Sequence, residues 1–478
     1  MNPVDLVVML PLISVGTAAV AVMLMVAVHR SYTGAFTITL AGLTAAVASL
    51  PWTMEGAPHR VTPLLMLDPY AVLYMGLLFA AAAGCVLLAH GYLRRYQGNR
   101  EEFYILMLLA TLGASVLAAC NHFASLFLGM ELLSISLYGL IAYPHSLDRH
   151  VEAGVKYLIL AAASSAFLLF GMALIYAGSG NMAIDRIGPM LGSIRLADNG
   201  PLLLAGLGMM VVGIGFKLAV VPFHLWTPDV YQGAPAPVTA FVATVSKGTL
   251  VALLLRLFPP GDIQVGSSLF IVFAAIAAAS MLAGNLLALL QSNVKRILAY
   301  SSIAHMGYLL VAFLAGGFLA FTAVTFYLIA YFVSTLGSFG VITVLSGPDK
   351  EAESLEDYRG LFWRSPWLAG VFTAMVLSLA GLPLTAGFVG KFYLVVAGVG
   401  GSLWALVIIL VLSSTIGLYY YLRIVVVLYA RQSEAKSSVP VLALSLCGRL
   451  TLAGLTLLLI WLGVMPAPVI RLIQTMLS

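Results

Sequence analysis

Apolar stretches long enough to cross a membrane recur along this chain from Leu6 almost to its C-terminus. A spanning α-helix needs about 20 mostly apolar residues. Only 9% of the residues are charged and 62% are hydrophobic, whereas soluble globular proteins usually carry about 25% charged residues. We therefore expect an all-α polytopic membrane protein with no room for a sizeable soluble domain.

Windows of about 19 residues predict about fourteen transmembrane helices. The first span follows Asp5 rather than a basic region and shows no clear small-residue cleavage site, so we expect it to be retained. The predicted spans lie near residues 6–28, 34–51, 70–90, 103–119, 122–142, 153–177, 201–231, 236–258, 267–290, 297–315, 319–345, 366–398, 402–428 and 441–465.

The basic residues of the predicted loops are distributed unevenly between the two sides of the membrane. Loops after even-numbered spans carry only Arg60, Arg186 and Arg195, whereas loops after odd-numbered spans carry Arg30, Arg94, Arg95, Arg100, Arg149, Lys295, Arg296, Lys350, Arg359, Arg364, Arg431 and Lys436. Cytoplasmic loops are enriched in Lys and Arg, so both termini are predicted on the outer side, the periplasm of a bacterial inner membrane. Because these residues form no aromatic-interleaved patch, nucleic acid is not an expected partner.

Two predicted spans are too long for one straight helix and contain helix breakers. The seventh reads GIGFKLAVVPFHLWTPDVYQG, in which Pro222 lacks the backbone donor that a continuous helix needs. The twelfth reads LAGLPLTAGFVGKFY and is broken by Pro383. Interrupted helices at corresponding places in two halves indicate inverted repeats and an ion path.

A short internal similarity agrees with such repeats. The run YLIL from Tyr157 in the sixth span matches YLIA from Tyr327 in the eleventh, and nearly the same offset relates Lys217 to Lys391. The two copies are separated by an odd number of spans, so they would be inverted in the membrane. Chance recurrence of small and apolar residues is the alternative explanation.

Several ionisable residues fall inside the predicted spans. A charge at the bilayer centre costs about 2.5–3.5 kcal/mol on insertion scales, so each one needs a reason to be there. Glu131, Lys247 and His305 are predicted near the midplane, Lys217 at the break of the seventh span and Lys391 just past the break of the twelfth. If their helices are neighbours, these residues form a lateral row that can pass protons, with Glu131 as the natural partner of Lys217.

Structural roles are the alternatives for these residues. Glu131 and Lys217 could be an ion pair that fixes helix packing, and His305 could hydrogen-bond a carbonyl across helices. Lys156 lies only a few residues into the sixth span, where its side chain could extend to the inner interface. His224 follows the break of the seventh span and could cap the second half-helix or gate proton access.

The sequence gives no sign of a cofactor or metal site in this chain. Cys85, Cys120 and Cys447 lie in or beside apolar segments and form no C-x-x-C pair, which makes a zinc site or a protein-ligated iron–sulfur cluster improbable. There is no Walker or G-x-G-x-x-G fingerprint. Any redox or ATP chemistry that drives this protein is expected on other chains.

The run FKLAVVPFHLWTPDVYQGAPAPVTAFVATVSK, from Phe216 to Lys247, closely resembles the signature of the antiporter-like membrane subunits of respiratory complex I. Further matches are GMELLSISLYGL around Glu131, EAGVKYLILAAASSAFLLFG around Lys156, NVKRILAYSSIAHMGY around His305 and LPLTAGFVGKF before Lys391. The resemblance covers most of the chain from about Ser125 to Tyr393. Within the family it is similar to the N type, because the chain ends soon after its last span, unlike the L type, and has Lys391 where the M type usually has Glu.

The resemblance implies a fourteen-helix fold with two inverted five-helix repeats, each containing a broken helix. The corresponding divisions are a three-helix N-terminal segment (1–100), a first repeat (101–260), a second repeat (261–430) and a last helix with its tail (431–478). The family's functional positions fall on Glu131 and Lys217 as a coupled pair, Lys247 as central relay and Lys391 as terminal lysine. Lys156 matches a family lysine, and His305 occupies a matching polar position.

The function implied is proton translocation within an NADH-quinone oxidoreductase, coupled to quinone reduction elsewhere in the complex. NAD, FMN, iron–sulfur clusters and quinone are then expected on other subunits. The partners would be an M-type subunit, small membrane-arm subunits and the lipid bilayer. The alternatives are a subunit of a multisubunit sodium/proton antiporter and a passive scaffold whose charges are structural.

Overall fold

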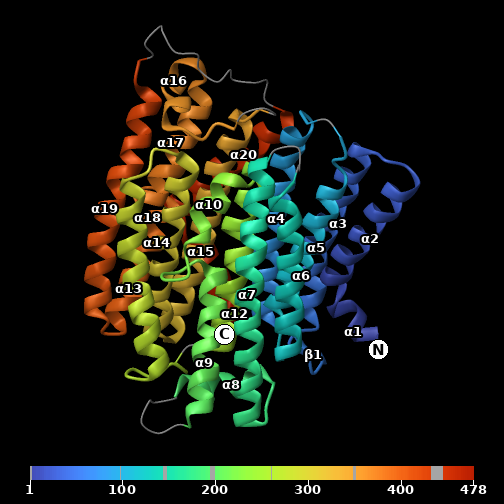
Figure 1. Cartoon of the computed structure of the whole chain (residues 1–478), viewed down its shortest axis with the longest axis vertical. Helices are drawn as coiled ribbons and strands as arrows, with labels where there is room; N and C mark the ends of the chain where they lie inside the picture. The colour runs from blue at the N-terminus through green and yellow to red at the C-terminus, as the bar shows by residue number, and fades with distance from the viewer. Residues whose placement is uncertain are drawn as a thin grey trace.

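The computed structural model describes residues 3–96, 98–143, 148–193, 200–259, 261–347, 351–431 and 445–477. Arg195, Lys350 and Lys436, which contribute to the predicted loop asymmetry, lie outside these ranges. The described chain is a bundle of long helices that run roughly side by side, with α2 and α3 at one edge and α13 and α19 at the other (Figure 1).

The helices of the first half are α1 (Pro3–Val8), α2 (Leu10–Val28), α3 (Tyr32–Glu55), α4 (Pro69–Leu93), α5 (Glu102–Ala118), α6 (Phe123–Ile141), α7 (Asp148–Ser179), α8 (Ile184–Gly192), α9 (Pro201–Leu218), α10 (Trp226–Gly233), α11 (Ala236–Phe241), the π-helix η1 (Val242–Ser246) and α12 (Lys247–Leu257). The second half contains α13 (Ser268–Leu289), α14 (Val294–Ala315), α15 (Gly317–Leu345), the 3₁₀-helix η2 (Leu355–Tyr358), α16 (Leu361–Arg364), α17 (Pro366–Ala380), α18 (Ala386–Gly400), α19 (Trp404–Tyr429), α20 (Leu446–Val464) and α21 (Ala467–Leu477).

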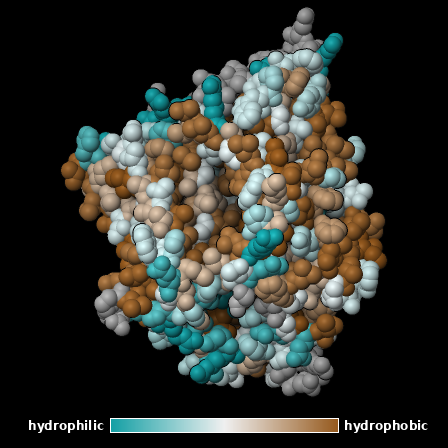
Figure 2. Space-filling view, turned by 180° about the vertical axis from the view of Figure 1, so that it is seen from behind, coloured by the Kyte–Doolittle hydropathy of each residue, from teal (hydrophilic) through white to brown (hydrophobic). Residues whose placement is uncertain are grey.

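The described helices confirm the prediction of about fourteen transmembrane helices. Twelve are long and apolar enough to cross a membrane by length and composition. The 17-residue α5 and the broken pair α17 and α18 are shorter apolar helices that account for the other crossings. Hydrophobic residues cover much of the face drawn in Figure 2, and most hydrophilic residues there lie towards its two ends.

Polar residues at the span ends fix where several helices begin. The Asp68 carboxylate accepts a hydrogen bond of 2.8 Å from the backbone N–H of Ala71, and the Asn293 side chain accepts one of 3.1 Å from the N–H of Arg296. Such caps satisfy N–H groups that have no partner inside the helix. They define the starts of α4 and α14.

Both predicted helix breaks are present. After α9, Ala219 takes a left-handed conformation (φ 61°) and the chain turns through Pro222 before α10 begins. The Trp226 indole N–H donates over 2.9 Å to the carbonyl of Phe216, which also accepts from the backbone N–H of Ala219 over 3.0 Å. After α17, Gly381 (φ 84°) and Leu384 (φ 70°) turn the chain into α18. The inverted relation of the two halves and the four-part division stay predictions.

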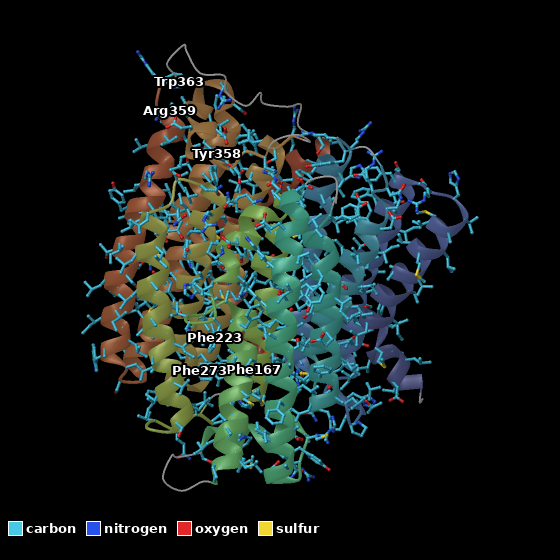
Figure 3. All side chains as sticks on the ribbon, viewed as in Figure 1. Phe167, Phe223, Phe273, Tyr358, Arg359 and Trp363 are labelled. Carbon is cyan, nitrogen blue, oxygen red and sulfur yellow. The ribbon has the colours of Figure 1, made fainter. Side chains whose placement is uncertain are left out.

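One end of the bundle carries elements that the hydrophobic pattern did not predict. The antiparallel strands β1 (His59–Thr62) and β2 (Leu65–Leu67) form a hairpin there. His59 lies 2.8 Å from Asp5, next to the start of the chain, and Met476 of α21 lines the same cavity as Pro58. The first and last helices therefore lie at the same end. Tyr358, Arg359 and Trp363 lie at the opposite end, whereas Phe167, Phe223 and Phe273 lie in the lower half of the view (Figure 3).

Candidate functional site: a row of buried lysines

The three lysines predicted inside the spans, Lys217, Lys247 and Lys391, all have buried side chains. The exposed fractions are 3% for Lys217, 0% for Lys247 and 9% for Lys391. Burying an ammonium group is costly unless hydrogen bonds or opposite charges compensate. The partners of these three lysines therefore decide what they can do.

Each of the three lysines has the same two kinds of partner, a serine hydroxyl and the face of a tyrosine ring. A ring face within about 6 Å attracts a cation. The ammonium groups donate to serine hydroxyls over 2.5 Å (Lys217 to Ser134), 2.6 Å (Lys247 to Ser302) and 2.8 Å (Lys391 to Ser414). They lie 5.6 Å from the ring centre of Tyr157, 5.5 Å from that of Tyr231 and 5.3 Å from that of Tyr308, in the same order.

Glu131 and Lys217 do not form a direct ion pair in this structure. Glu131 on α6 accepts a hydrogen bond of 2.5 Å from Ser165 of α7, while Lys217 on α9 donates to Ser134, one turn after Glu131. α7 packs against both α6 and α9. The direct contact expected from the sequence is absent, and each charged group is hydrogen-bonded to a serine instead.

Lys247 begins α12 directly after the π-helix η1, and all residues from Val242 to Leu255 are buried. A π turn holds one more residue than an α turn and is frequently found at functional sites. Ser302 on α14, the hydrogen-bond partner of Lys247, also lies 2.6 Å from the Tyr331 hydroxyl and 3.5 Å from that of Tyr231. The Lys247 ammonium therefore faces a cluster of hydroxyl groups and no carboxylate.

His305 occupies the centre of the second half. Its Nδ1 contacts the Tyr327 hydroxyl, and its Nε2 lies 3.0 Å from the Tyr421 hydroxyl. Ser302, His305 and Tyr308 follow one another at spacings of three residues on α14, which places them on one face of that helix. This face spans about 9 Å from Ser302 to Tyr308. It therefore connects the surroundings of Lys247 with those of Lys391.

Lys391 is held by the second helix break. Its ammonium donates to the carbonyl of Ala380, the last residue of α17, over 2.8 Å. The break supplies this acceptor because α17 does not continue past it. A Cβ atom at Gly381 would come within 2.7 Å of the Lys391 side chain, so a residue without a side chain is needed there. Lys391 and Ser414 also line an open cavity of about 330 Å³ between α17, α18 and α19.

Two residues of the predicted set are not in the buried row. The Lys156 side chain is 49% exposed and pairs with Glu152 over 2.6 Å, with Asp229 at 4.0 Å. His224 lies in the turn after α9 and is buried, but no contact joins it to Lys217, Lys247 or Lys391 in the described structure. Its backbone carbonyl accepts from the N–H of Thr227 over 3.0 Å, at the start of α10.

The hydroxyl partners were not identified from the sequence, although one signal for them was available. Tyr327 and Tyr331 are four residues apart in an apolar span, α15. Ser302 and His305 are three residues apart in the neighbouring helix α14. Polar residues at such spacings share a helix face. Among the described residues, no group of three His, Cys, Asp or Glu side chains is placed to hold a metal ion.

Comparison with known proteins shows the family to which the chain belongs. Residues 120–417 match the family described as NADH:quinone oxidoreductase/Mrp antiporter, TM. The chain is therefore a member of this class of antiporter-type transmembrane proteins. NADH-quinone oxidoreductase subunit N of Ectopseudomonas mendocina (strain ymp) is 49% identical over 479 residues, which cover 98% of this chain and 96% of that protein. Within the class, the chain belongs to the family of NADH-quinone oxidoreductase N subunits.

Solved structures agree with the assignment. A chain of respiratory complex I from Thermus thermophilus with bound aureothin is 33% identical, with a TM-score of 0.82 over 96% of this chain and 98% of that one. A chain of the Mrp complex from Dietzia sp. DQ12-45-1b superposes with a TM-score of 0.85 over 100% of this chain and 97% of that one, at 22% identity. The latter likeness concerns the fold alone.

Proposed function

We propose that this chain is the proton-translocating N-type membrane subunit of an NADH-quinone oxidoreductase in a bacterial inner membrane, with both termini in the periplasm. The observation that carries the proposal is the recurring unit of lysine, serine and tyrosine at Lys217, Lys247 and Lys391. Each unit offers an amine that can gain or lose a proton beside a hydroxyl that can donate or accept one. The identity to an N subunit supports the respiratory assembly as the setting.

In the proposed mechanism, quinone reduction on other subunits changes the electric field along the membrane arm. Moving the Glu131 charge relative to Lys217 then alters how tightly Lys217 holds its proton, because a nearby carboxylate favours a charged lysine and burial disfavours it. The proton passes through water and hydroxyl groups to Lys247 and, by way of the His305 face of α14, to Lys391. The cavity beside Lys391 provides a way out. NAD, FMN, the iron–sulfur clusters and quinone belong to other subunits in this proposal.

Lys156 and His224 take different parts in this scheme. Lys156 is exposed on the flank of α7, so we assign it to exchange with a neighbouring membrane-arm subunit or with the inner interface. His224 begins the second half of the broken span, so we assign it to the geometry of the break. Neither is needed for transfer between Lys247 and Lys391.

The central test is replacement of Lys247 in the assembled complex. Lys247→Met removes the amine, and Lys247→Arg keeps the charge but cannot release a proton, because a guanidinium stays protonated in proteins. We expect both variants to lower proton pumping by about a hundredfold, the lower end of the range for a positioned proton-transfer group. Pumping is measured in proteoliposomes during NADH oxidation, alongside assembly of the complex.

The Arg variant separates the relay from a structural role. If Lys247→Arg pumps normally in an assembled complex, only the positive charge matters and the relay is wrong. If Lys247→Met also pumps normally, the scaffold alternative is correct. The sodium/proton antiporter alternative has support from the fold alone, because the Mrp chain is 22% identical. A requirement of pumping for sodium would favour it.

A further inference from the structure

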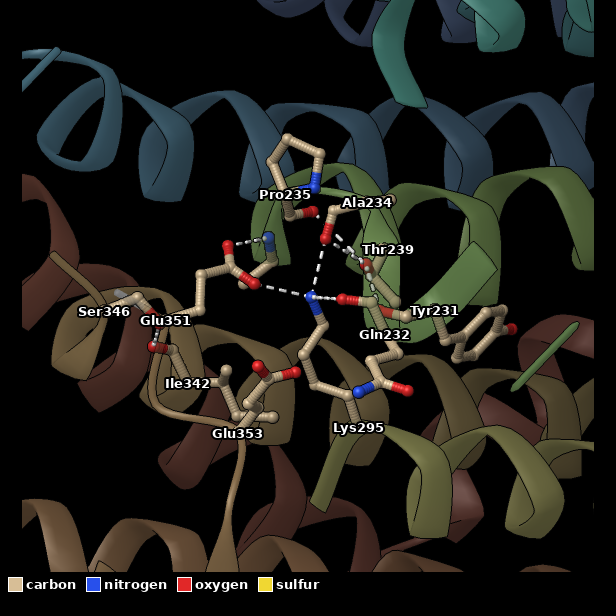
Figure 4. A network of polar contacts seen from close by, with 12 residues as sticks. Tyr231, Gln232, Ala234, Pro235, Thr239, Lys295, Ile342, Ser346, Glu351 and Glu353 are labelled. Carbon is tan, nitrogen blue, oxygen red and sulfur yellow. Dashed lines mark hydrogen bonds and ion pairs between the residues drawn. The ribbon is translucent and has the colours of Figure 1, made fainter. Parts of the chain in front are cut away.

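A second buried lysine site lies outside the row. Lys295 at the start of α14 and Glu351 in the segment after α15 both have side chains that are 0% exposed, and their charged groups are 2.6 Å apart. Lys295 belongs to one of the predicted loops on the side that carries most of the basic residues. The pair lies instead inside the protein, against the junction between α10 and α11 (Figure 4).

The pair satisfies the backbone groups that this junction leaves without partners. The Lys295 ammonium donates to the carbonyls of Gln232 and Ala234 over 3.0 and 2.6 Å, as well as to Glu351. Glu351 in turn accepts from the backbone N–H of Ala236 over 2.9 Å and from the Tyr92 hydroxyl over 2.7 Å. Carbonyls at the end of one helix and N–H groups at the start of the next are the groups that lack intrahelical partners.

Lys295 and Lys247 differ in how their ammonium groups are bonded. All three N–H donors of Lys295 have protein acceptors, two of them carbonyls that cannot move without unfolding a helix end. Among the described residues Lys247 donates to Ser302 alone. A backbone carbonyl accepts a hydrogen bond but has no proton of its own to pass on, whereas the Ser302 hydroxyl both accepts and donates. Lys295 is therefore suited to holding structure and Lys247 to proton transfer.

The junction also sets the surroundings of Lys247. Tyr231, directly before Gln232, lies with its ring 5.5 Å from the Lys247 ammonium and its hydroxyl 3.5 Å from Ser302. Ser302 itself lies seven residues after Lys295 on α14, about 10 Å along the same helix face. The Lys295–Glu351 pair thus ties together the two segments that supply both contacts of Lys247.

We propose that Lys295 and Glu351 are positioning residues that clamp the α10–α11 junction against α14 and so hold Tyr231 and Ser302 on Lys247. The inference rests on the proposed role of Lys247 and adds the device that fixes its proton-transfer geometry. It makes a specific chemical demand: the side chain on α14 must donate hydrogen bonds, and the side chain at position 351 must accept one from a backbone N–H.

Two double variants in the assembled complex test this demand. Lys295→Met with Glu351→Gln removes both charges without leaving one buried alone. Lys295→Glu with Glu351→Lys keeps an ion pair but turns a carboxylate towards carbonyls and an ammonium towards an N–H. The matched control is Arg359→Gln, which breaks the exposed 2.7 Å pair with Glu356 in the same segment.

Two measurements follow each variant: hydrogen exchange of the backbone amides of 236–241, and the pH profile of proton pumping. We expect both double variants to speed exchange by about tenfold, the effect of losing one hydrogen bond to a charged group, and to shift the pH of half-maximal pumping. The Arg359→Gln control should change neither. A merely structural ion pair far from Lys247 would not move the pH profile.

The possible results distinguish a positioning role of Lys295 and Glu351 from a purely structural one. If the charge-swapped variant matches the parent in both measurements, an ion pair of either polarity suffices and the clamp is wrong. Failure of the neutral double variant to assemble would mean that the pair is required for folding rather than positioning, which also overturns the proposal. If the neutral double variant assembles and its 236–241 amides exchange at the parent rate, the clamp is wrong, and this conclusion does not depend on how the Lys247→Met variant pumps. Normal pumping by Lys247→Met would defeat the proton relay and leave the exchange result standing.

Discussion

The ammonium of Lys247 and the hydroxyl of Ser302 are 2.6 Å apart, and this hydrogen bond joins the helix after the π turn to the polar face of α14. Ser302 is also bonded to Tyr331. A serine in this position can pass a proton in either direction because its hydroxyl both donates and accepts. The contact is therefore the place where the two halves of the proposed path meet.

Replacement of this serine is expected to slow the path without removing the amine. Ser302→Ala should lower the rate of proton pumping by about tenfold, since a hydrogen bond to a charged group contributes about 1.5–3 kcal/mol. The measurement is initial proton uptake by proteoliposomes at matched complex content. Ser136→Ala is the control, because Ser136 is buried on α6 and donates only to the carbonyl of Leu132 in its own helix, over 2.7 Å. Equal effects of the two changes would contradict a specific role for Ser302.

The hydroxyls around His305 give a second prediction. Tyr327→Phe combined with Tyr421→Phe removes both partners of the imidazole while keeping the rings in place. Pumping should fall by about tenfold or more, because a proton-transfer group that loses its hydrogen-bonded neighbours loses much of its contribution. Tyr419→Phe is the control, since that tyrosine is 65% exposed on the same helix as Tyr421. Normal pumping by the double variant would remove His305 from the path.

The ion pair of Arg256 and Asp68 should matter for stability rather than for pumping. Their charged groups are 2.7 Å apart, and the arginine also donates to the carbonyl of Ala118. Arg256→Met leaves the carboxylate without its partner and should destabilise the subunit by about 3–5 kcal/mol. Arg60→Gln, which breaks the exposed pair with Asp185, should cost at most about 1 kcal/mol. The survival of assembled complex after heating distinguishes the two.

The pH dependence of the junction follows from Glu351. Burial by itself would raise the pKa of this carboxyl, but the Lys295 ammonium and the hydrogen bonds from Lys295, Tyr92 and Ala236 hold the pKa below its ordinary value. A carboxyl with a lowered pKa in the folded state stabilises the fold above its ordinary pKa, and this stabilisation is lost as the pH falls through the lowered value.

The protection of the 236–241 amides, which is the intrinsic exchange rate relative to the observed rate at each pH, should therefore be high at neutral pH and fall as the pH drops below roughly 4, the ordinary range of a glutamate. Glu351→Gln should remove this acid dependence and exchange faster than the parent at neutral pH. Glu356→Gln, in the exposed pair with Arg359, should keep the parent profile. An identical profile for parent and Glu351→Gln would contradict the argument.

The sequence was sufficient to predict the transmembrane spans and the two helix breaks. Apolar windows predict crossings because length and composition alone decide them, and Pro222 and Pro383 interrupt helices for a reason local to each residue. The burial of Lys217, Lys247 and Lys391 was likewise expected, because these residues lie deep inside the predicted spans. The family resemblance, and not the pattern, supplied the order in which they act.

The sequence could not predict which helix faces contact one another, and the reason is physical. In α14 and α15, 94% of the scanned window is buried, so nearly every face is buried and periodicity does not tell which face meets Lys247. The link from Glu131 to Lys217 depends on how α6, α7 and α9 pack together. The burial of Lys295 depends on how the segment at Glu351 folds back. The hairpin of β1 and β2 is too short and too polar for a hydropathy window to detect.

The π turn before Lys247 decides where a change in chain length is tolerated in this protein. Because the turn accommodates one residue more than a regular helix, deleting any single residue from 242–246 would let the segment relax into an ordinary α-helix. The turn absorbs its extra residue locally, so the helical segments on its two sides would keep their relative orientation after this deletion. One residue inserted into the regular helix at 236–241 is not absorbed in this way, and it would rotate the preceding segment by about 100° relative to Lys247 although no polar group had been altered.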